Sequence, residues 1–272
     1  MAVLHNQVLR PAGFSELFPV WSRYPDAILF AGGTALIRSQ GRELPKLPDN
    51  VLSLEKIDEL HRITRTERYL EIGAAVKLSD IIALGKIVPG AFSRTLRGIA
   101  GPSIRNLATI GGNLCVCGDA TAPMAALDAR YELRSAGGIR WISANRFSSL
   151  PMNLQAQELL SRIRIPLEQW TYTIYRKFCS PPENDGGVLL ILVQNQKDIL
   201  AKIQIVFAGH TLFRDKNSET FLEGKALPLD RKEAFHYRDL WKTYLDGLGK
   251  PGPLLRSKIL NGIEAAILGL AD

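Results

Sequence analysis

The chain has 272 residues, 46% of them hydrophobic, and its 34 basic and 27 acidic side chains give a net charge of +7. This composition predicts a compact protein of two or three modules with a sizeable core and excludes a disordered chain. Since no apolar run reaches the roughly 18 to 20 residues of a membrane helix, and Met1 to Arg10 lack a signal-peptide pattern, we expect a cytoplasmic protein with no membrane contact.

The first segment predicts alternating helix and strand. Residues 15–24 form a helical pattern with Ser15 as N-cap, and residues 27–30 form a short apolar strand that enters a glycine turn at residues 31–35. Glycines at a strand-to-helix turn let backbone N–H groups surround a phosphate. The turn matches neither the mononucleotide P-loop nor the Rossmann pattern, so by itself it is either an anion cradle or a plain tight turn.

The middle of the chain contains a second glycine turn, Thr109-Ile110-Gly111-Gly112-Asn113. Two such turns in one chain are able to hold two ends of a phosphorylated cofactor, which one turn alone is not. Around this turn the sequence predicts strands at 50–54, within 60–76, at 131–135 and at 159–165, and helices at 79–84 (capped by Ser79), 92–100 and 123–129.

The last third predicts a separate α+β module. Its strands are expected at 171–177, 188–194 and 203–208, and its helices at 231–245 and 254–268. The expected organisation is therefore three modules, with residues 1–56, 57–168 and 169–272.

Metal and nucleic-acid binding find little support. Cys115, Cys117 and Cys179 are too few for a disulfide framework or for the roughly four soft ligands of a metal site, and the histidines are scattered. The basic residues are interleaved with other types and no nucleic-acid motif accompanies them, so they predict a solvated face or a stripe that docks onto an acidic partner.

Four segments resemble one known family in the same order along the chain. Residues 31–37 are similar to A-G-G-T-x-L-[LI], 72–78 to I-G-A-x-x-x-L, 104–115 to I-R-N-x-A-T-I-G-G-N-[LI], and 158–166 to E-L-[LI]-x-x-[IV]-x-[IV]-P. These patterns are typical of the FAD-binding (medium) subunits of the molybdenum hydroxylase family, of the xanthine dehydrogenase and carbon monoxide dehydrogenase type.

The resemblance implies an α+β protein with the two-subdomain FAD-binding fold of the vanillyl-alcohol-oxidase/p-cresol-methylhydroxylase type, plus a small C-terminal α+β domain. It implies FAD as cofactor and no catalytic side chain. The cofactor contacts that it implies are two turns and four further positions: Ala31, Gly32, Gly33, Thr34, Ala35, Leu36, Ile104, Thr109, Ile110, Gly111, Gly112, Asn113, Asp119, Leu160 and Lys177. From the residues alone, Asp119 is equally a turn or cap residue, and Lys177 equally a solvated lysine.

The same resemblance implies an oxidoreductase function in electron transfer. Iron–sulfur clusters and the molybdenum cofactor are expected on partner subunits, because three cysteines are too few for two clusters, and NAD is a possible acceptor. The segment from Cys179 to Gly187 departs from the family pattern, which leaves the acceptor open. The alternatives are a cofactor-poor structural subunit of such a complex and a stand-alone flavin oxidase.

Overall fold

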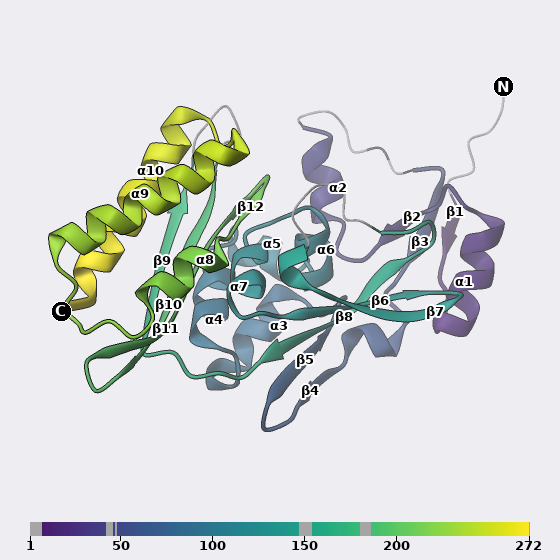
Figure 1. Cartoon of the computed structure of the whole chain (residues 1–272). Helices are drawn as coiled ribbons and strands as arrows, with labels where there is room; N and C mark the ends of the chain where they lie inside the picture. Colours follow the sequence, from purple (N-terminus) through teal and green to yellow (C-terminus); the bar gives the residue numbers. More distant parts are fainter. Residues whose placement is uncertain (1–6, 42–45, 47, 147–153, 180–185, 272) are drawn as a thin grey trace.

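The computed structural model describes residues 7–41, 46, 48–146, 154–179 and 186–271. Its strands form three sheets, of three, five and four strands, which follow one another along the chain (Figure 1). The first is a parallel sheet in the order β1-β3-β2, accompanied by two helices. Its elements are β1 (Gln7–Leu9), α1 (Phe14–Arg23), β2 (Ile28–Phe30), α2 (Thr34–Ser39) and β3 (Asn50–Ser53).

The second sheet is antiparallel, in the order β4-β5-β8-β6-β7, and carries the middle of the chain. Its strands are β4 (Ile63–Arg65), β5 (Tyr69–Gly73), β6 (Arg130–Ser135), β7 (Gly138–Ser143) and β8 (Leu159–Pro166). The helices of this region are η1 (Asp58–His61), α3 (Leu78–Ala83), η2 (Gly85–Ile87), α4 (Gly90–Arg97), α5 (Pro102–Arg105), α6 (Ile110–Cys115), α7 (Thr121–Ala126) and η3 (Ala144–Arg146).

Two helix caps differ from the prediction. The N-cap of α1 is Gly13 rather than Ser15, and the Glu16 carboxylate accepts a hydrogen bond from the Ala12 amide at 2.7 Å, so Ser15 lies inside the first turn. The N-cap of α3 is Lys77 rather than Ser79. Lys77 is paired with Thr109 in a short bridge, and this tertiary contact, not the side chain of Ser79, decides where α3 begins.

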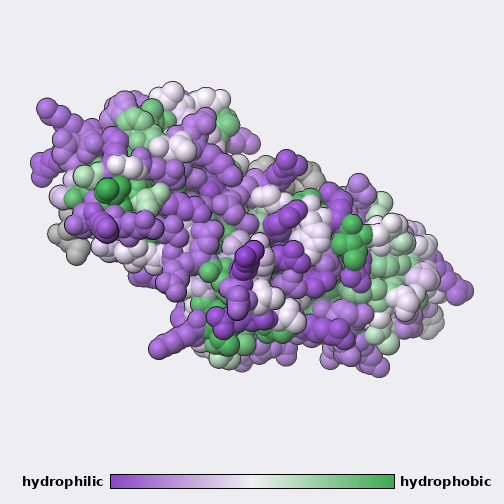
Figure 2. Space-filling view, turned by 60° about the horizontal axis from the view of Figure 1, so that its bottom comes forward, coloured by the Kyte–Doolittle hydropathy of each residue, from purple (hydrophilic) through white to green (hydrophobic). Residues whose placement is uncertain are grey.

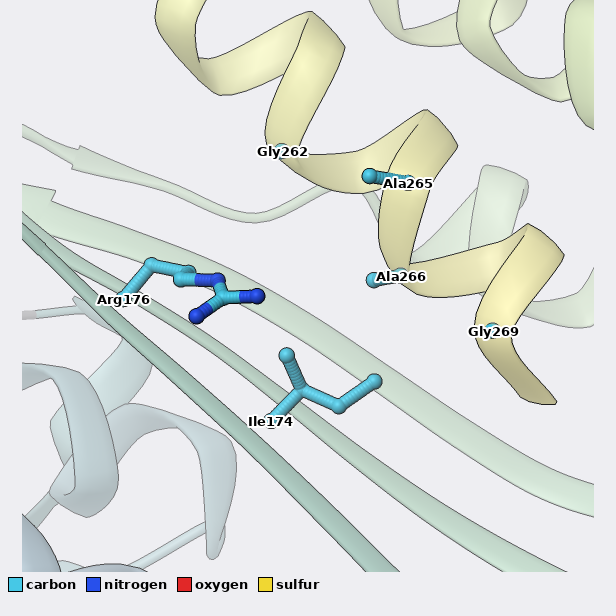
Figure 3. Close-up of a pocket in the computed structure, with 6 residues that line it drawn as sticks. All are labelled: Ile174, Arg176, Gly262, Ala265, Ala266 and Gly269. Atoms are coloured by element: carbon cyan, nitrogen blue, oxygen red, sulfur yellow. The ribbon is translucent and has the colours of Figure 1, made fainter. Parts of the chain in front are cut away.

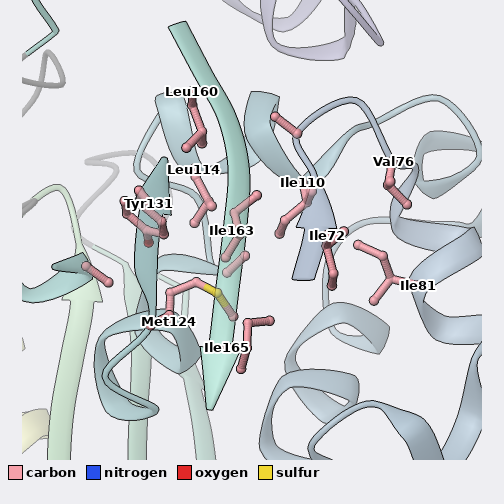
Figure 4. Close-up of a cluster of buried hydrophobic side chains, with 14 of the residues drawn as sticks. Ile72, Val76, Ile81, Ile110, Leu114, Met124, Tyr131, Leu160, Ile163 and Ile165 are labelled. Atoms are coloured by element: carbon pink, nitrogen blue, oxygen red, sulfur yellow. The ribbon is translucent and has the colours of Figure 1, made fainter. Parts of the chain in front are cut away.

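The inner face of the five-stranded sheet is the centre of the protein. Ile72, Ile163 and Tyr131 are register partners across β5, β8 and β6, so their side chains lie in one row on one face of the sheet. All three are buried (Figure 4). Met124 of α7 and Ile110 of α6 contribute to the same cluster. The helices therefore cover this face, and one of them carries the second glycine turn.

The third sheet has two buried faces. It runs in the order β12-β11-β10-β9, with β9 (Tyr172–Phe178), β10 (Gly187–Gln196), β11 (Ile199–Gly209) and β12 (Leu212–Phe213). Leu190 and Val206 face the large core that contains α7, whereas Leu189 and Ile205 face a second cluster under the long helices. These helices are α8 (Lys216–Leu222), α9 (Arg231–Leu248) and α10 (Pro253–Leu268), followed by η4 (Gly269–Ala271).

The expected strands and long helices of the C-terminal third are present, whereas β12 and α8 were not predicted. The division at 1–56, 57–168 and 169–272 stays a proposal. One core cluster joins side chains from before residue 57, from the middle of the chain and from β10 and β11, so the C-terminal sheet is packed against the rest of the molecule.

The surface is mostly hydrophilic, and hydrophobic side chains on the face shown in Figure 2 form small, separate groups. In the described part of the chain, the helices are all too short or too polar to cross a membrane.

Candidate functional site

The first glycine turn joins β2 to α2 and leaves its backbone amides open. Gly33 adopts the left-handed conformation with φ of 67°, and Thr34 begins the short helix. The first amides of a helix have no partner within the helix. Among the described residues, the amides of Gly33, Thr34, Ala35 and Leu36 donate no hydrogen bond. Four successive open N–H groups around a left-handed residue form a nest that suits an anion.

The second glycine turn is built differently, because its amides are already used. The amides of Ile110 and Gly111 donate to the carbonyls of Val76 and Ala74 at 3.0 and 2.8 Å. The Gly112 amide donates to the Thr109 hydroxyl at 3.2 Å, and the Asn113 amide to the Thr109 carbonyl at 3.0 Å. Thr109 thus caps α6. The second turn is therefore packed against the protein, and it can contact a ligand through its surface but not through free N–H groups.

The two turns lie against each other at Gly32. A Cβ atom at this position would lie 2.0 Å from the carbonyl oxygen of Leu107, two residues before the second turn. Only glycine permits this approach of two backbones. Gly111 serves the second turn in a similar way, since its Cβ would lie 2.7 Å from both the Cβ and the carbonyl oxygen of Ala74.

Asp119 and Lys177 lie beside the second turn, and the region formed by the two turns and this pair is called the wall below. The Asp119 carboxylate and the ammonium group of Lys177, on strand β9, form an ion pair of 2.6 Å. Lys177 also donates a hydrogen bond to the Gly98 carbonyl at 3.0 Å. Asn113 connects the second turn to this pair, because its side-chain oxygen accepts the Ala120 amide at 3.1 Å. Tyr175 lies nearby on β9; burial and the neighbouring Asp119 raise its pKa to about 12.

The remaining two predicted residues lie in different surroundings. Ile104 is 44% exposed beside the approach of the two turns. Leu160 is buried on β8, in the cluster shown in Figure 4 with Leu114, and the next residue, Ser161, accepts the Ala74 amide under the second turn. Leu160 thus supports the wall from beneath.

The structure therefore brings the two turns, Asp119 and Lys177 into one connected region. The connection runs from Gly32 through Leu107 and the second turn to Asp119 and Lys177. Leu107 and Gly98 were not predicted, because both take part through backbone carbonyls, which leave no sequence signal. Residues 180–185, in the segment that departs from the family pattern, lie outside the described residues.

Other parts of the molecule offer less. A hollow of about 200 Å³ lies between β9 and α10, where Ile174 and Arg176 point toward Gly262 and Ala266 (Figure 3). None of the predicted site residues lines this hollow. Over the described ranges, no three histidine, cysteine, aspartate or glutamate side chains gather closely enough to hold a metal ion.

Residues 4–168 match the family described as the FAD binding domain in molybdopterin dehydrogenase. Aldehyde oxidase 2 of Cavia porcellus is 33% identical over 195 residues, which are 64% of this chain and 14% of that protein. The xanthine dehydrogenase FAD-binding subunit of Escherichia coli O157:H7 is 29% identical over 165 residues, 58% of this chain and 56% of that subunit.

Solved structures agree with this fold along nearly the whole chain. A chain in the crystal structure of quinoline 2-oxidoreductase from Pseudomonas putida 86 has a TM-score of 0.82 at 22% identity and covers 97% of this chain and 96% of its own. A chain of the carbon monoxide dehydrogenase from Hydrogenophaga pseudoflava has a TM-score of 0.79 at 21% identity, with 97% and 94% covered.

The family match over residues 4–168 defines a flavin-binding class of protein. The chain belongs to the family of FAD-binding domains of molybdopterin dehydrogenases. The predicted fold class, family and cofactor are thereby confirmed, and the relatives are oxidoreductases of the xanthine dehydrogenase and carbon monoxide dehydrogenase type. Because the chain spans about half of one relative and a small part of another, their whole activity is not transferred with the family.

Proposed function

We propose that this chain holds FAD along the wall described above and serves as the electron-transfer subunit of a molybdenum hydroxylase or dehydrogenase. Electrons would arrive from iron–sulfur clusters on one partner subunit, a molybdenum-cofactor subunit would oxidise the organic substrate, and NAD or another acceptor would receive the electrons. When bound, FAD supplies the ability to exchange electrons singly or in pairs.

The observation that carries this proposal is the nest of open amides at Gly33, Thr34, Ala35 and Leu36. A buried or half-buried N–H group without an acceptor is costly, so a nest of this kind suits the oxygens of a diphosphate. The second turn would position the rest of the cofactor by contact, with Ile104 and Leu107 offering exposed apolar surface to a flat ring.

Asp119 and Lys177 fit the polar middle of such a cofactor. A carboxylate accepts hydrogen bonds from ribityl or ribose hydroxyls, and an ammonium group donates to oxygens of a phosphate or of the flavin ring. In the structure the two groups satisfy each other at 2.6 Å. Since both remain partly exposed, each keeps hydrogen-bonding capacity for a ligand. No side chain of this chain needs to act as a nucleophile or as an acid.

The test is the absorbance spectrum of the purified chain, with and without added FAD. Bands at about 370 and about 450 nm, with FAD released on denaturation, support the proposal. A colourless chain that takes up no FAD, either alone or together with its partner subunits, would instead support a cofactor-poor structural subunit.

A further inference from the structure

The C-terminal sheet is attached to the rest of the molecule at both ends of α7. Asp119 lies two residues before α7 and pairs with Lys177 of β9. Asp128 lies two residues after α7 and pairs with Arg214 at 2.7 Å, immediately after β12. Strands β9 and β12 are the two edges of the sheet, so α7 is held at opposite edges by two ion pairs.

Arg214 is the more deeply buried of the two cations, with its side chain 5% exposed. Its guanidinium donates to the Ala125 carbonyl at 2.6 Å and to the Asn145 side-chain oxygen at 3.2 Å, besides Asp128. Glu219 of α8 accepts from the other side at 2.9 and 3.1 Å. The planar fork of arginine is thus shared between α7, η3 and α8.

Asp128 is itself held in an uncommon backbone conformation, with φ of 51°. Its carboxylate accepts from Arg214, from the Gln204 amide at 2.8 Å and from the Asn145 amide at 2.6 Å. Two of these donors belong to the C-terminal third and one to η3. The end of α7 is therefore fixed to the C-terminal third through both Arg214 and Gln204, whereas near its beginning Asp119 pairs with Lys177 of β9.

We propose that Arg214 is a positioning residue for the cofactor wall: by fixing the end of α7 to the C-terminal sheet, it holds Lys177 against Asp119. The four hydrogen-bonded strands of this sheet connect the two sites, since β12 pairs with β11, β11 with β10, and Val188 of β10 with Lys177 of β9. If the clamp loosens, the sheet shifts on α7 and the ion pair at the other edge opens. The effect on flavin rests on the proposed function.

Chemical labelling of lysine amines in the full chain measures this linkage without any cofactor. Lys177 should label slowly relative to the exposed Lys242, because its ammonium group is engaged by Asp119 and the Gly98 carbonyl. Arg214→Met should raise the relative rate at Lys177 about tenfold, equivalent to about 1.4 kcal/mol. Lys225→Gln, which breaks the Lys225–Glu233 pair of the same C-terminal third, is the matched control and should leave the Lys177 rate unchanged.

A second variant covers the case in which Arg214→Met does not fold. Asp128→Asn keeps a residue that tolerates positive φ and removes only the charge, so the backbone is preserved. We expect the Lys177 rate to rise about threefold in folded Asp128→Asn, a smaller change than in Arg214→Met because several hydrogen bonds remain. An unchanged Lys177 rate in this variant would overturn the proposal.

FAD affinity supplies the second measurement. Arg214→Lys and Lys177→Gln should each weaken FAD binding, and the double variant should lose no more than Lys177→Gln alone, since Arg214 acts through Lys177. Additive losses would overturn this route. If the unmodified chain binds no FAD, either alone or together with its partner subunits, the proposed function fails, while the labelling experiment still decides the role of Arg214.

Discussion

The two glycine turns each contain a Gly-Gly pair and belong to the same wall, yet they differ in how their amides are used. The first turn leaves the amides of residues 33–36 open, and α2 has no buried side chain. The second turn directs its amides to Val76, Ala74 and Thr109 and buries Ile110 and Leu114. The same Gly-Gly pair therefore leaves its neighbouring amides free to donate to a ligand in the first turn, whereas in the second turn it packs the turn against the rest of the protein.

The cause of this difference lies in what each turn packs against. The second turn lies on the end of β5, whose last residue, Gly73, is followed by the carbonyls of Ala74 and Val76 at hydrogen-bond distance. The first turn follows a three-residue strand and meets the rest of the molecule through the close approach of Gly32 to Leu107. Four predictions test the different roles of the first turn, whose open amides bind the ligand, and of the second turn, which is a packed support.

Gly32→Ala should have the largest effect on cofactor binding. Its Cβ would lie 2.0 Å from the Leu107 carbonyl oxygen, so the two turns must separate and the wall is interrupted. We expect FAD affinity to fall about 100-fold, or about 2.7 kcal/mol, measured by fluorescence titration. Gly247→Ala is the control, because nothing lies within 4 Å of its Cβ. Unchanged affinity in Gly32→Ala would mean that the cofactor does not bridge the turns.

Gly111→Ala should act on stability instead. The added methyl group meets Ala74 at 2.7 Å in a buried position, and overpacking of this kind costs about 1 to 3 kcal/mol. The free energy of unfolding from urea denaturation should fall by this amount, while FAD affinity of the folded protein changes less than about threefold. A loss of affinity without a loss of stability would show that the second turn also acts as a donor.

A negative charge should distinguish the two turns in a third experiment. Thr34→Asp places a carboxylate among the open amides of the nest and should weaken FAD binding about tenfold by competing for these donors and repelling the diphosphate. Thr34→Asn, of nearly the same size, is the uncharged control. Gly112→Asp should weaken binding less, because the amides of its turn are already engaged. The reverse order would exchange the roles of the turns.

The smallest expected effect concerns the stability in acid of β5, the strand on whose end the second turn packs. Glu71 lies on β5 between Arg162 and Arg164, at 2.9 and 2.6 Å. Burial raises its pKa, but the hydrogen bonds and charges of the two arginines outweigh burial, and the net pKa is lowered. The carboxylate therefore stabilises the fold above the unfolded pKa of about 4.3, and this contribution is lost as pH falls through the lower folded value.

Glu71→Gln should reduce the slope of unfolding free energy against pH in the acid range, by less than about 1 kcal/mol in total, because the pair is partly exposed. Urea denaturation at several pH values between about 3 and 6 measures this slope. An identical slope in the variant would show that Glu71 gains nothing from its arginines.

Much of this arrangement could be predicted from the sequence. Alternation along residues 159–165 and the turn patterns gave the strands and the family, because local periodicity and motifs are properties of neighbouring residues. The strand at Gly138–Ser143 was missed, since its apolar residues Ile139, Trp141 and Ile142 do not alternate regularly with polar ones and none of its side chains is fully buried. The cap at Gly13 was missed because the Glu16 carboxylate accepts the Ala12 amide at the start of α1, and the cap at Lys77 because Lys77 is bridged to Thr109, far away in the sequence.

From the sequence, the candidate site could be stated as a set of positions, whereas the different roles of the two turns could not. The motif A-T-I-G-G-N predicts a glycine turn. Whether an amide of this turn is left without an acceptor depends on carbonyls thirty or more residues away, such as that of Ala74. Likewise, the family resemblance predicts Lys177 near the cofactor, whereas nothing in the sequence indicates Arg214, whose partners come from α7, η3 and α8.

The most direct test of the central claim, that open amides of the first turn hold a diphosphate, is a parallel titration of the chain with FAD and with riboflavin. Riboflavin has the same ring and ribityl chain but lacks both the diphosphate and the adenosine. The account predicts that FAD binds at least about 100-fold more tightly, since several backbone N–H groups gain charged acceptors. Equal affinity for the two ligands would contradict it.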